Sequence, residues 1–266
     1  MSGAMWAFLR RDYRLARTAR LALAWQIVSV ACTVPTMYYL GRLLRPPAPV
    51  LGASGGDYFA FVSVGVACLG LCSAGMGACA AAVRQEQMGG TLDVLLLSPA
   101  PVWALAAGAS LWTMLVAAGQ TGLYLVFAAI AFHLDFSRAN VAGAAAALVL
   151  TMGVCAALGV LSASLVLLLR RPDVLTSLVT SASVLLAGVF YPTRVLPSAL
   201  QRAAELLPLT HALRALRLAL LRGDGVAALG TELRALLLFV LVLSPVALVA
   251  GRVALAEARR SGIPAG

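Results

Sequence analysis

The sequence predicts an all-α integral membrane protein with six transmembrane helices. Of its 266 residues, 62% are hydrophobic and only 11% are charged, and the mean hydropathy is +0.95. A soluble domain is about half apolar and a quarter charged. The apolar residues lie in runs that approach or exceed the roughly 20 residues needed to cross a bilayer core. Because these runs take up nearly the whole chain, we expect a single membrane domain over residues 1–266.

A basic amphipathic segment at residues 5–20 precedes the first apolar run. Arg10, Arg14 and Arg17 recur at helical spacing, and Trp6 lies on another side of the same helix. This pattern is typical of a helix that lies in the headgroup plane of a membrane. The paired arginines also fit a twin-arginine export signal. No small-residue cleavage site follows, however, so we favour the interface helix.

Six apolar runs follow, and we expect each to be a membrane span. The third is longer than a straight crossing needs, so it must tilt or break. The fourth carries a small residue every four positions, which lets another helix approach closely, within the bundle or across a dimer. The six runs cover residues 21–40, 58–83, 102–132, 141–169, 174–190 and 233–250. The small residues of the fourth are Gly143, Ala147, Thr151, Cys155, Gly159 and Ala163.

Two segments between the runs are more polar. Residues 84–101 (RQEQMGGTLDVLLLSPAP) form a short island in which Thr91 fits a helix start and Ser98–Pro99 a helix stop. A compact surface helix here would suit docking of a soluble partner, and an ordinary solvated turn is the alternative. Residues 191–231 are too polar for one span and too apolar for a free loop. Because Pro208 divides them, we expect two short helices, at about 197–207 and 209–221.

The basic residues exclude several functions. All twenty are Arg, and the chain has no Lys. A P-loop requires a Lys that reaches the terminal phosphates of the nucleotide, so this chain is not a Walker-type ATPase. The net charge of +10 is compatible with nucleic-acid binding. The Arg residues cluster beside apolar runs, however, so we expect membrane lipid, and not nucleic acid, to be their partner.

The predicted spans contain no Asp, Glu, Lys, Arg or His apart from Arg234, at the edge of the last one. Ion-coupled and proton-driven transporters usually keep an ionisable group at membrane depth, so both classes are disfavoured. The sequence shows no catalytic triad, paired-carboxylate site or H-E-x-x-H zinc motif. His133 and His211 fall near membrane boundaries, where a structural role is favoured over metal ligation. We therefore expect no enzyme activity and no cofactor in this chain.

The cysteines do not predict a disulfide framework, because an odd number of them lies inside apolar runs. Cys68, Cys72 and Cys79 share one helix face. No His or carboxylate joins them, so small packing residues are favoured over a metal site. All five are Cys32, Cys68, Cys72, Cys79 and Cys155.

The distribution of Arg predicts the orientation of the chain. With the N-terminus in the cytoplasm, eleven Arg residues lie on the inner side and three in the short outer loops. The remaining six lie at residues 194–234, in or beside a long segment of the kind that obeys the rule poorly. We therefore expect both termini and residues 84–101 to be cytoplasmic, in a multi-pass protein of the cell membrane.

Residues 84–101 resemble a stretch of the type-2 ABC exporter permeases. The run Glu86…Gly90-Thr91-Leu92…Leu95-Leu96…Ser98-Pro99 is similar to their pattern E-x-x-x-G-T-L-x-x-L-L-x-S-P. These are the membrane subunits of polysaccharide, nodulation-factor and drug-resistance exporters. The resemblance implies that the island is the coupling helix, which sits in a cleft of the ATP-binding subunit. A departure is Met88 before Gly89-Gly90, where the family more often has a charged residue before a single Gly. The implied contacts are Glu86, Gly90, Thr91, Leu92, Leu95, Leu96, Ser98 and Pro99.

Residues 188–223 are also similar to this family, in the order Gly188…Tyr191-Pro192…Leu196-Pro197…Leu207-Pro208-Leu209-Thr210…Arg214…Arg217…Gly223. The resemblance implies two re-entrant helices on the outer side between spans five and six. It also implies a complex of two permeases, as a homodimer or with a homologous permease, and two ATPase subunits that bind ATP and Mg.

The predicted function is export of a hydrophobic or amphipathic compound, such as a drug, natural product, lipid or glycan. Gln26 and Gln120 are candidate polar points along an otherwise apolar path. A non-transporting scaffold or assembly factor that docks a partner through residues 84–101 is the alternative. A permease of an importer or of a lipid-extraction machine is a third reading.

Overall fold

The computed structural model describes residues 20–44, 58–88, 102–132, 136, 139–169 and 174–260, and every regular element there is helical. The prediction of an all-α fold is confirmed for these residues. The long helices are α2 (Arg20–Leu44), α4 (Tyr58–Met88), α6 (Val102–Phe132), α7 (Val141–Leu169) and α11 (Gly230–Arg260). The short ones are α8 (Val174–Leu186), a 3-10 turn η2 (Thr193–Val195), α9 (Ser198–Glu205), α10 (Pro208–Arg217) and a π-helical turn η3 (Leu218–Arg222).

Four helices are long and apolar enough to cross a membrane within the described residues: Tyr58–Arg84, Leu111–Phe132, Val141–Leu168 and Gly230–Glu257. They establish a multi-pass membrane protein. The helix α2 covers the first predicted span, and α8 covers most of the fifth. With 13 residues, α8 is about 20 Å long, shorter than a hydrocarbon core of about 30 Å. The count of six spans therefore stays a prediction.

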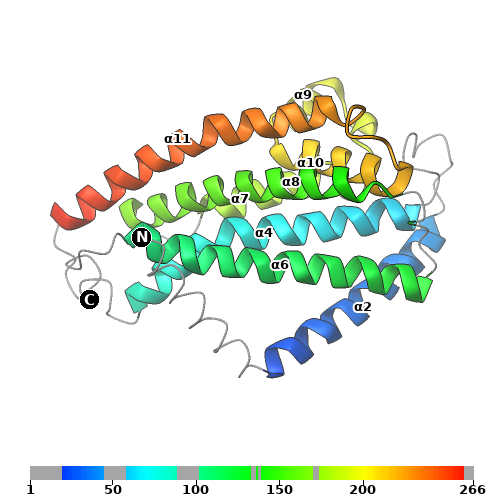
Figure 1. Cartoon of the computed structure of the whole chain (residues 1–266), viewed down its shortest axis with the longest axis horizontal. Helices are drawn as coiled ribbons and strands as arrows, with labels where there is room; N and C mark the ends of the chain where they lie inside the picture. Colours follow the sequence, from blue (N-terminus) through cyan, green and yellow to red (C-terminus); the bar gives the residue numbers. More distant parts are fainter. Residues whose placement is uncertain are drawn as a thin grey trace.

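The long helices lie side by side and alternate in direction (Figure 1). Helices α4, α7 and α11 all end at one end of the bundle, where α6 and α8 begin. Helices α9 and α10 gather at the opposite end. A hydrogen bond from the Asn140 amide to the Asp224 carbonyl (2.9 Å) ties the start of α7 to the segment after η3 there. The end of α4 and the start of α6, which precede and follow residues 89–101 in the sequence, thus lie at the end of the bundle opposite α9 and α10.

The small-residue stripe of α7 packs against α4 inside the chain. Ala147, Thr151 and Cys155 are buried. A Cβ placed on Gly159 would lie 3.1 Å from the carbonyl oxygens of both Gly75 and Met76, so the two backbones nearly touch. Of the two roles that the stripe suggested, close approach within the bundle is the one seen here.

Helix α10 turns back into the bundle with an apolar face. Leu209, Leu213 and Leu216 are buried in the same core as residues of α4, α7 and α11. The short helices α9 and α10 fall where the sequence predicted them, around Pro208, which begins α10 as its first residue. The core that they complete is the largest in the described part of the chain.

The bounds of four helices differ from the predicted spans. Helix α2 continues to Leu44, four residues beyond the predicted end of the first span. Helix α4 continues to Met88, so Glu86 lies in its last turn, not in a separate segment; residues 84–88 are mostly good helix formers. Helix α11 extends beyond 233–250 at both ends. The fifth span was predicted over 174–190, but α8 ends at Leu186. Gly188 has φ of +80°, a conformation that a continuing α-helix cannot adopt.

Candidate functional site

The interior of the bundle carries hydroxyl groups and almost no charge. Thr121 donates to the Ala117 carbonyl (2.9 Å) and Thr151 to the Ala147 carbonyl (2.7 Å), so these hydroxyls are satisfied within their own helices. Among the buried polar side chains of the described residues, the only charged one is Arg217. The full set is Ser63, Thr121, Thr151, Ser162, Ser164, Ser183, Thr210 and Arg217.

Arg217, at the end of α10, binds backbone carbonyls on two other segments. Its Nε and one terminal nitrogen donate to the Phe61 carbonyl of α4 (3.3 and 3.0 Å). The terminal nitrogens also donate to the carbonyls of Gly188 (2.9 Å) and Val189 (3.1 Å), just after α8. The guanidinium carbon lies 3.4 Å from the centroid of the Phe61 ring, which adds a cation–π contact. These four residues form what we call the Arg217 junction.

The junction explains where α8 stops. The carbonyls of Gly188 and Val189 have left the helix and would be unsatisfied, and Arg217 supplies the missing donors. Burial lowers the pKa of Arg217 to about 9, which still leaves the guanidinium charged at neutral pH. Among the ion pairs of the described residues, none involves Arg217, so carbonyl dipoles and an aromatic face stabilise this charge.

Gly65 of α4 makes room for the junction. A Cβ at this position would lie 2.5 Å from the Val189 carbonyl oxygen and 2.9 Å from a terminal nitrogen of Arg217. Both distances are shorter than real Cβ contacts allow. The absence of a side chain at residue 65 is therefore a requirement for the segment after α8 to lie against α4.

A second polar cluster joins α9, α10 and α11 beside the junction. Arg214 donates to both carboxylate oxygens of Glu205 (2.6 and 3.1 Å) and to the hydroxyl of Thr193 (3.2 Å). His211 Nδ1 lies 2.6 Å from a carboxylate oxygen of Glu232. The hydrogen bond with Glu232 raises the pKa of His211, and Arg214 lowers the pKa of Glu205. His211 thus has the structural role expected from the sequence.

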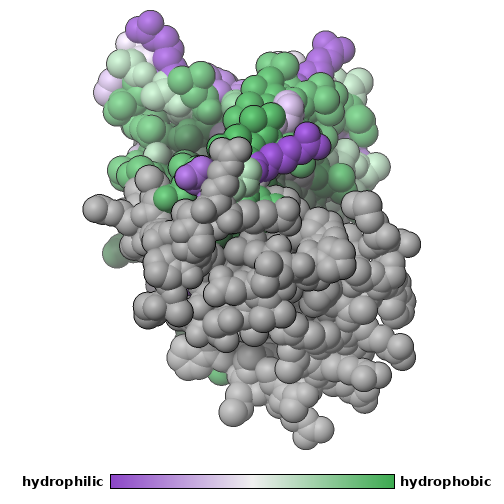
Figure 2. All heavy atoms as spheres, turned by 90° about the vertical axis from the view of Figure 1, so that its left-hand side faces the viewer, coloured by the Kyte–Doolittle hydropathy of each residue, from purple (hydrophilic) through white to green (hydrophobic). Residues whose placement is uncertain are grey.

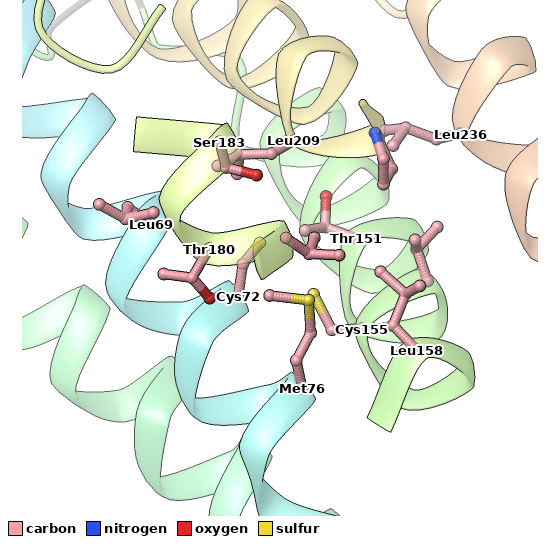
Figure 3. A pocket seen from close by; sticks show the side chains of 13 residues that line it. Leu69, Cys72, Met76, Thr151, Cys155, Leu158, Thr180, Ser183, Leu209 and Leu236 are labelled. Atoms are coloured by element: carbon pink, nitrogen blue, oxygen red, sulfur yellow. The ribbon is translucent and has the colours of Figure 1, made fainter. Parts of the chain in front are cut away.

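A cavity lies between α4, α7, α8, α10 and α11 (Figure 3). It leaves about 20 Å³ for the centre of a water-sized molecule, enough for one such molecule. Its lining is mostly apolar, with a few hydroxyl and sulfur groups. The lining residues are Leu69, Cys72, Met76, Thr151, Val154, Cys155, Leu158, Val179, Thr180, Ser183, Pro208, Leu209 and Leu236.

Helix α4 keeps one narrow face uncovered although most of its surface is buried. We call it the α4 strip; it consists of Gly70, Ser73, Gly77 and Ala81, all partly or fully exposed at helical spacing. A Cβ on Gly70 or Gly77 would meet no atom within 4 Å. The strip is therefore a shallow surface of small residues, and not a packing face within this chain.

Most residues of the predicted coupling and interface segments lie outside the residues that the structure describes. These are Gly90, Thr91, Leu92, Leu95, Leu96, Ser98 and Pro99, and Trp6, Arg10, Arg14 and Arg17. The backbone of Glu86 belongs to the last turn of α4. Figure 2 looks onto this end of the bundle, where hydrophilic side chains stand among hydrophobic ones in the described part. Gln120 is partly buried in α6, and the side chain of Gln26 in α2 is not described.

The role of Arg217 was not predicted from the sequence, where it entered the Arg count and the resemblance over residues 188–223 but was assigned no contact. A signal for burial was present. Arg217 lies four residues after Leu213 and eight after Leu209, so it falls on the apolar face of α10. Among the described residues, no group of three or more His, Cys, Asp or Glu side chains forms a metal site.

Comparison with protein families gave a match to the family model described as ABC-2 type transporter, over residues 4–221. The match covers more than half of the chain and runs from the predicted interface segment to η3. It includes residues 84–101 and all but the last two residues of the 188–223 stretch on which the resemblance was based. A comparison with curated proteins gave no match.

Proposed function

The chain belongs to the ABC-2 type transporter family, and from that premise we propose that it is the permease through which a separate ATPase exports a hydrophobic or amphipathic compound. The family makes the chain a transmembrane subunit of an ABC transporter and not its catalytic ATPase. The direction of transport, the cargo class and the route of coupling belong to the proposal.

The observation that carries the proposal is the uncharged interior. The buried polar groups of the described bundle are hydroxyls and Arg217, whose donors are occupied by backbone carbonyls. An ion-coupled transporter needs a group at membrane depth that binds and releases the ion. Since the described spans offer no Asp, Glu, Lys or His side chain at this depth for the purpose, the energy for transport has to come from a partner that hydrolyses ATP.

Coupling to that partner is assigned to residues 84–101. Helices α4 and α6 flank this segment at the end of the bundle opposite α9 and α10 (Figure 1). Glu86, in the last turn of α4, and Thr91 would supply polar contacts, and Leu92, Leu95 and Leu96 would fill an apolar groove of the ATPase. Movement of the ATPase subunits would then act directly on α4. The ATPase can shift the permease between its two transport states only if it binds one of them more tightly than the other.

The α4 strip is our candidate wall of the transport path. Small residues leave space for a cargo, and Ser73 adds a hydroxyl to an otherwise apolar surface. A single chain with few spans cannot enclose a path, so two permeases would face each other across it. An apolar path of this kind suits a hydrophobic or amphipathic cargo.

The test of coupling uses the permease reconstituted with its ATPase. We expect Glu86→Lys and Leu96→Asp to leave membrane insertion intact and to abolish the stimulation of ATP hydrolysis by the permease. The control is Leu206→Asp, which places the same charge on an exposed leucine at the opposite end of the bundle. It should retain stimulation. Unchanged stimulation in both variants of residues 84–101 would remove this segment from the mechanism.

A second test addresses the path. Gly77→Leu places a bulky side chain on the α4 strip without a clash inside the chain. We expect the variant to keep the ATPase bound and to lose transport of a fluorescent amphipathic compound from vesicles. Gly122→Leu on α6, where a Cβ also meets no atom, is the matched control. Equal transport by the two variants would contradict the assignment of the strip.

A further inference from the structure

Three sulfur atoms converge on the internal cavity from two helices. Cys72 and Met76 come from α4, one turn apart, and Cys155 comes from α7. All three side chains are buried and line the same space, and Figure 3 shows their sulfur atoms directed into it. The Cys72 thiol is in hydrogen-bonding contact with the thiols of both Cys155 and Cys68, of which Cys155 also lines the cavity. The cavity therefore has two thiols and a thioether on one side.

The packing of α4 on α7 holds these groups together. A Cβ on Gly75, between Cys72 and Met76, would lie 3.0 Å from the Cβ of Cys155. The backbones of the two helices are therefore in near contact at this level. The donors belong to a tightly packed part of the bundle, so little reorganisation would be needed to bring them around a small ion.

The cavity also has a polar group without a partner. The hydroxyl oxygen of Thr180, from α8, is buried and makes no hydrogen bond. An unpaired buried hydroxyl is costly, and such groups usually mark a missing water, ion or ligand. A thiolate formed at Cys72 or Cys155 would accept a hydrogen bond from a donor of this kind.

We propose that Cys72, Cys155 and Met76 form a binding site for a soft monovalent metal cation, Cu(I). Thiolate and thioether sulfurs are the ligands that select Cu(I), and its low coordination number suits two or three donors. Binding forms two Cu–S(thiolate) bonds, with the Met76 sulfur as a third donor. It releases the two thiol protons to solvent, and no electron is transferred.

The three proposed ligands are not the three cysteines, Cys68, Cys72 and Cys79, that share one face of α4. Cys79 packs in a separate cluster with Val83 and Ala163. Cys68 contacts the Cys72 thiol but does not line the cavity, and the described residues contain no group of three His, Cys, Asp or Glu side chains that could hold a metal ion. The third donor is a thioether on α4, and the second thiol comes from α7, more than eighty residues away in sequence.

The test is a Cu(I) competition with the purified full chain in detergent, under anaerobic reducing conditions. Cu(I) is titrated in the presence of a coloured Cu(I) chelator, and ultraviolet thiolate-to-copper charge-transfer absorption is recorded. We expect the wild type to withhold one equivalent of Cu(I) and to develop the absorption band. Cys72→Ala and Cys155→Ala should each lose both the bound equivalent of Cu(I) and the absorption band. Met76→Leu should retain less Cu(I) than the wild type at the same chelator concentration.

Controls separate loss of a ligand from loss of the fold. Cys32→Ala on the exposed face of α2 and Cys79→Ala in the separate cluster should still withhold one equivalent. Circular dichroism and gel filtration check that each variant folds. Failure of the wild type to withhold Cu(I), or retention of the equivalent by Cys72→Ala and Cys155→Ala, would overturn the proposal. Because the ATPase is absent from this assay, either result leaves the transport function to be judged separately.

Discussion

Substitution of Gly65 by alanine tests the Arg217 junction directly. The new Cβ would lie 2.5 Å from the Val189 carbonyl oxygen, whereas ordinary contact begins at 3.4 Å. The segment after α8 would have to move away from α4 by about 0.9 Å, the difference of these two distances. The hydrogen bond from Arg217 to Val189, now 3.1 Å, would not survive this shift while the bond to Phe61 is kept.

The expected loss of stability follows from these contacts. Overpacking a tight site costs about 1–3 kcal/mol, and a lost hydrogen bond to a charged group costs about 1.5–3 kcal/mol. Replacing glycine by alanine within a helix returns about 1 kcal/mol. The free energy of unfolding should therefore fall by about 2–5 kcal/mol, which corresponds to a melting temperature lower by about 5–15 °C for a chain of this size.

The assay is thermal melting of the purified chain in one detergent, followed by circular dichroism. Gly70→Ala and Gly77→Ala are matched controls on the same helix, because a Cβ at either position meets no atom within 4 Å. Both should melt at the wild-type temperature or slightly above it. If Gly65→Ala melted together with these controls, the close approach of Val189 and Arg217 to α4 would be refuted.

Three other predictions concern neighbouring contacts. Arg217→Lys should destabilise the chain by about 2–4 kcal/mol, because a lysine ammonium cannot bond three separated carbonyls as a planar guanidinium does; an unchanged melting temperature would contradict this. The raised pKa of His211 means that its interaction with Glu232 stabilises the fold fully below the ordinary value of 6.5 and is lost as the pH rises through the raised value. The melting temperatures of wild type and His211→Gln should accordingly differ at pH 6 and converge at high pH, and a difference that grows with pH would refute the assignment. Gly159→Val should separate α7 from α4 and destabilise by about 1–3 kcal/mol, whereas Gly122→Val on an open face of α6 should not.

The sequence predicted the long helices well because their signal is local. The apolar runs at 102–132 and 141–169 coincide with α6 and α7. Each is bounded by residues that the membrane interior or the helix excludes, such as Pro101 before α6 and Arg170 after α7. The division of residues 191–231 at Pro208 follows from the same kind of signal.

The end of α8 could not be predicted in this way, because its cause is distant in the chain. Residues 187–190 are apolar and continue the run of α8, so they resemble more helix. The segment leaves the helix where Arg217, 29 residues further on, donates to the Gly188 carbonyl. The sequence around Gly188 does not contain the donor for its free carbonyl group, because that donor is the distant Arg217.

The metal-binding set that we propose could not be predicted from the sequence for a related reason. Periodicity shows that Cys68, Cys72 and Cys79 share a face of α4, and that Cys155 belongs to the small-residue stripe of α7. It does not show how the two helices are rotated and staggered against each other. That geometry depends on the fit between Gly75 and Gly159 across the interface, which places Cys155 next to Cys72.

The position of α4 suggests how the two ends of the permease communicate. Gly65 and Glu86 lie on one unbroken helix, about 32 Å apart along its axis. Gly65 contacts the Arg217 junction, and Glu86 belongs to the segment that we assign to the ATPase contact. A rigid helix held at both ends transmits displacement, so a defect at residue 65 should reach the ATPase.

We therefore expect Gly65→Ala, assayed well below its melting temperature, to bind the ATPase subunit normally but to stimulate ATP hydrolysis less than the wild type does. His211→Gln is the control, since it perturbs the contacts of α10 with α9 and α11 without touching α4. Normal stimulation by a folded Gly65→Ala permease would show that α4 does not carry the movement. The coupling would then have to pass through α6, whose start flanks the other side of residues 89–101.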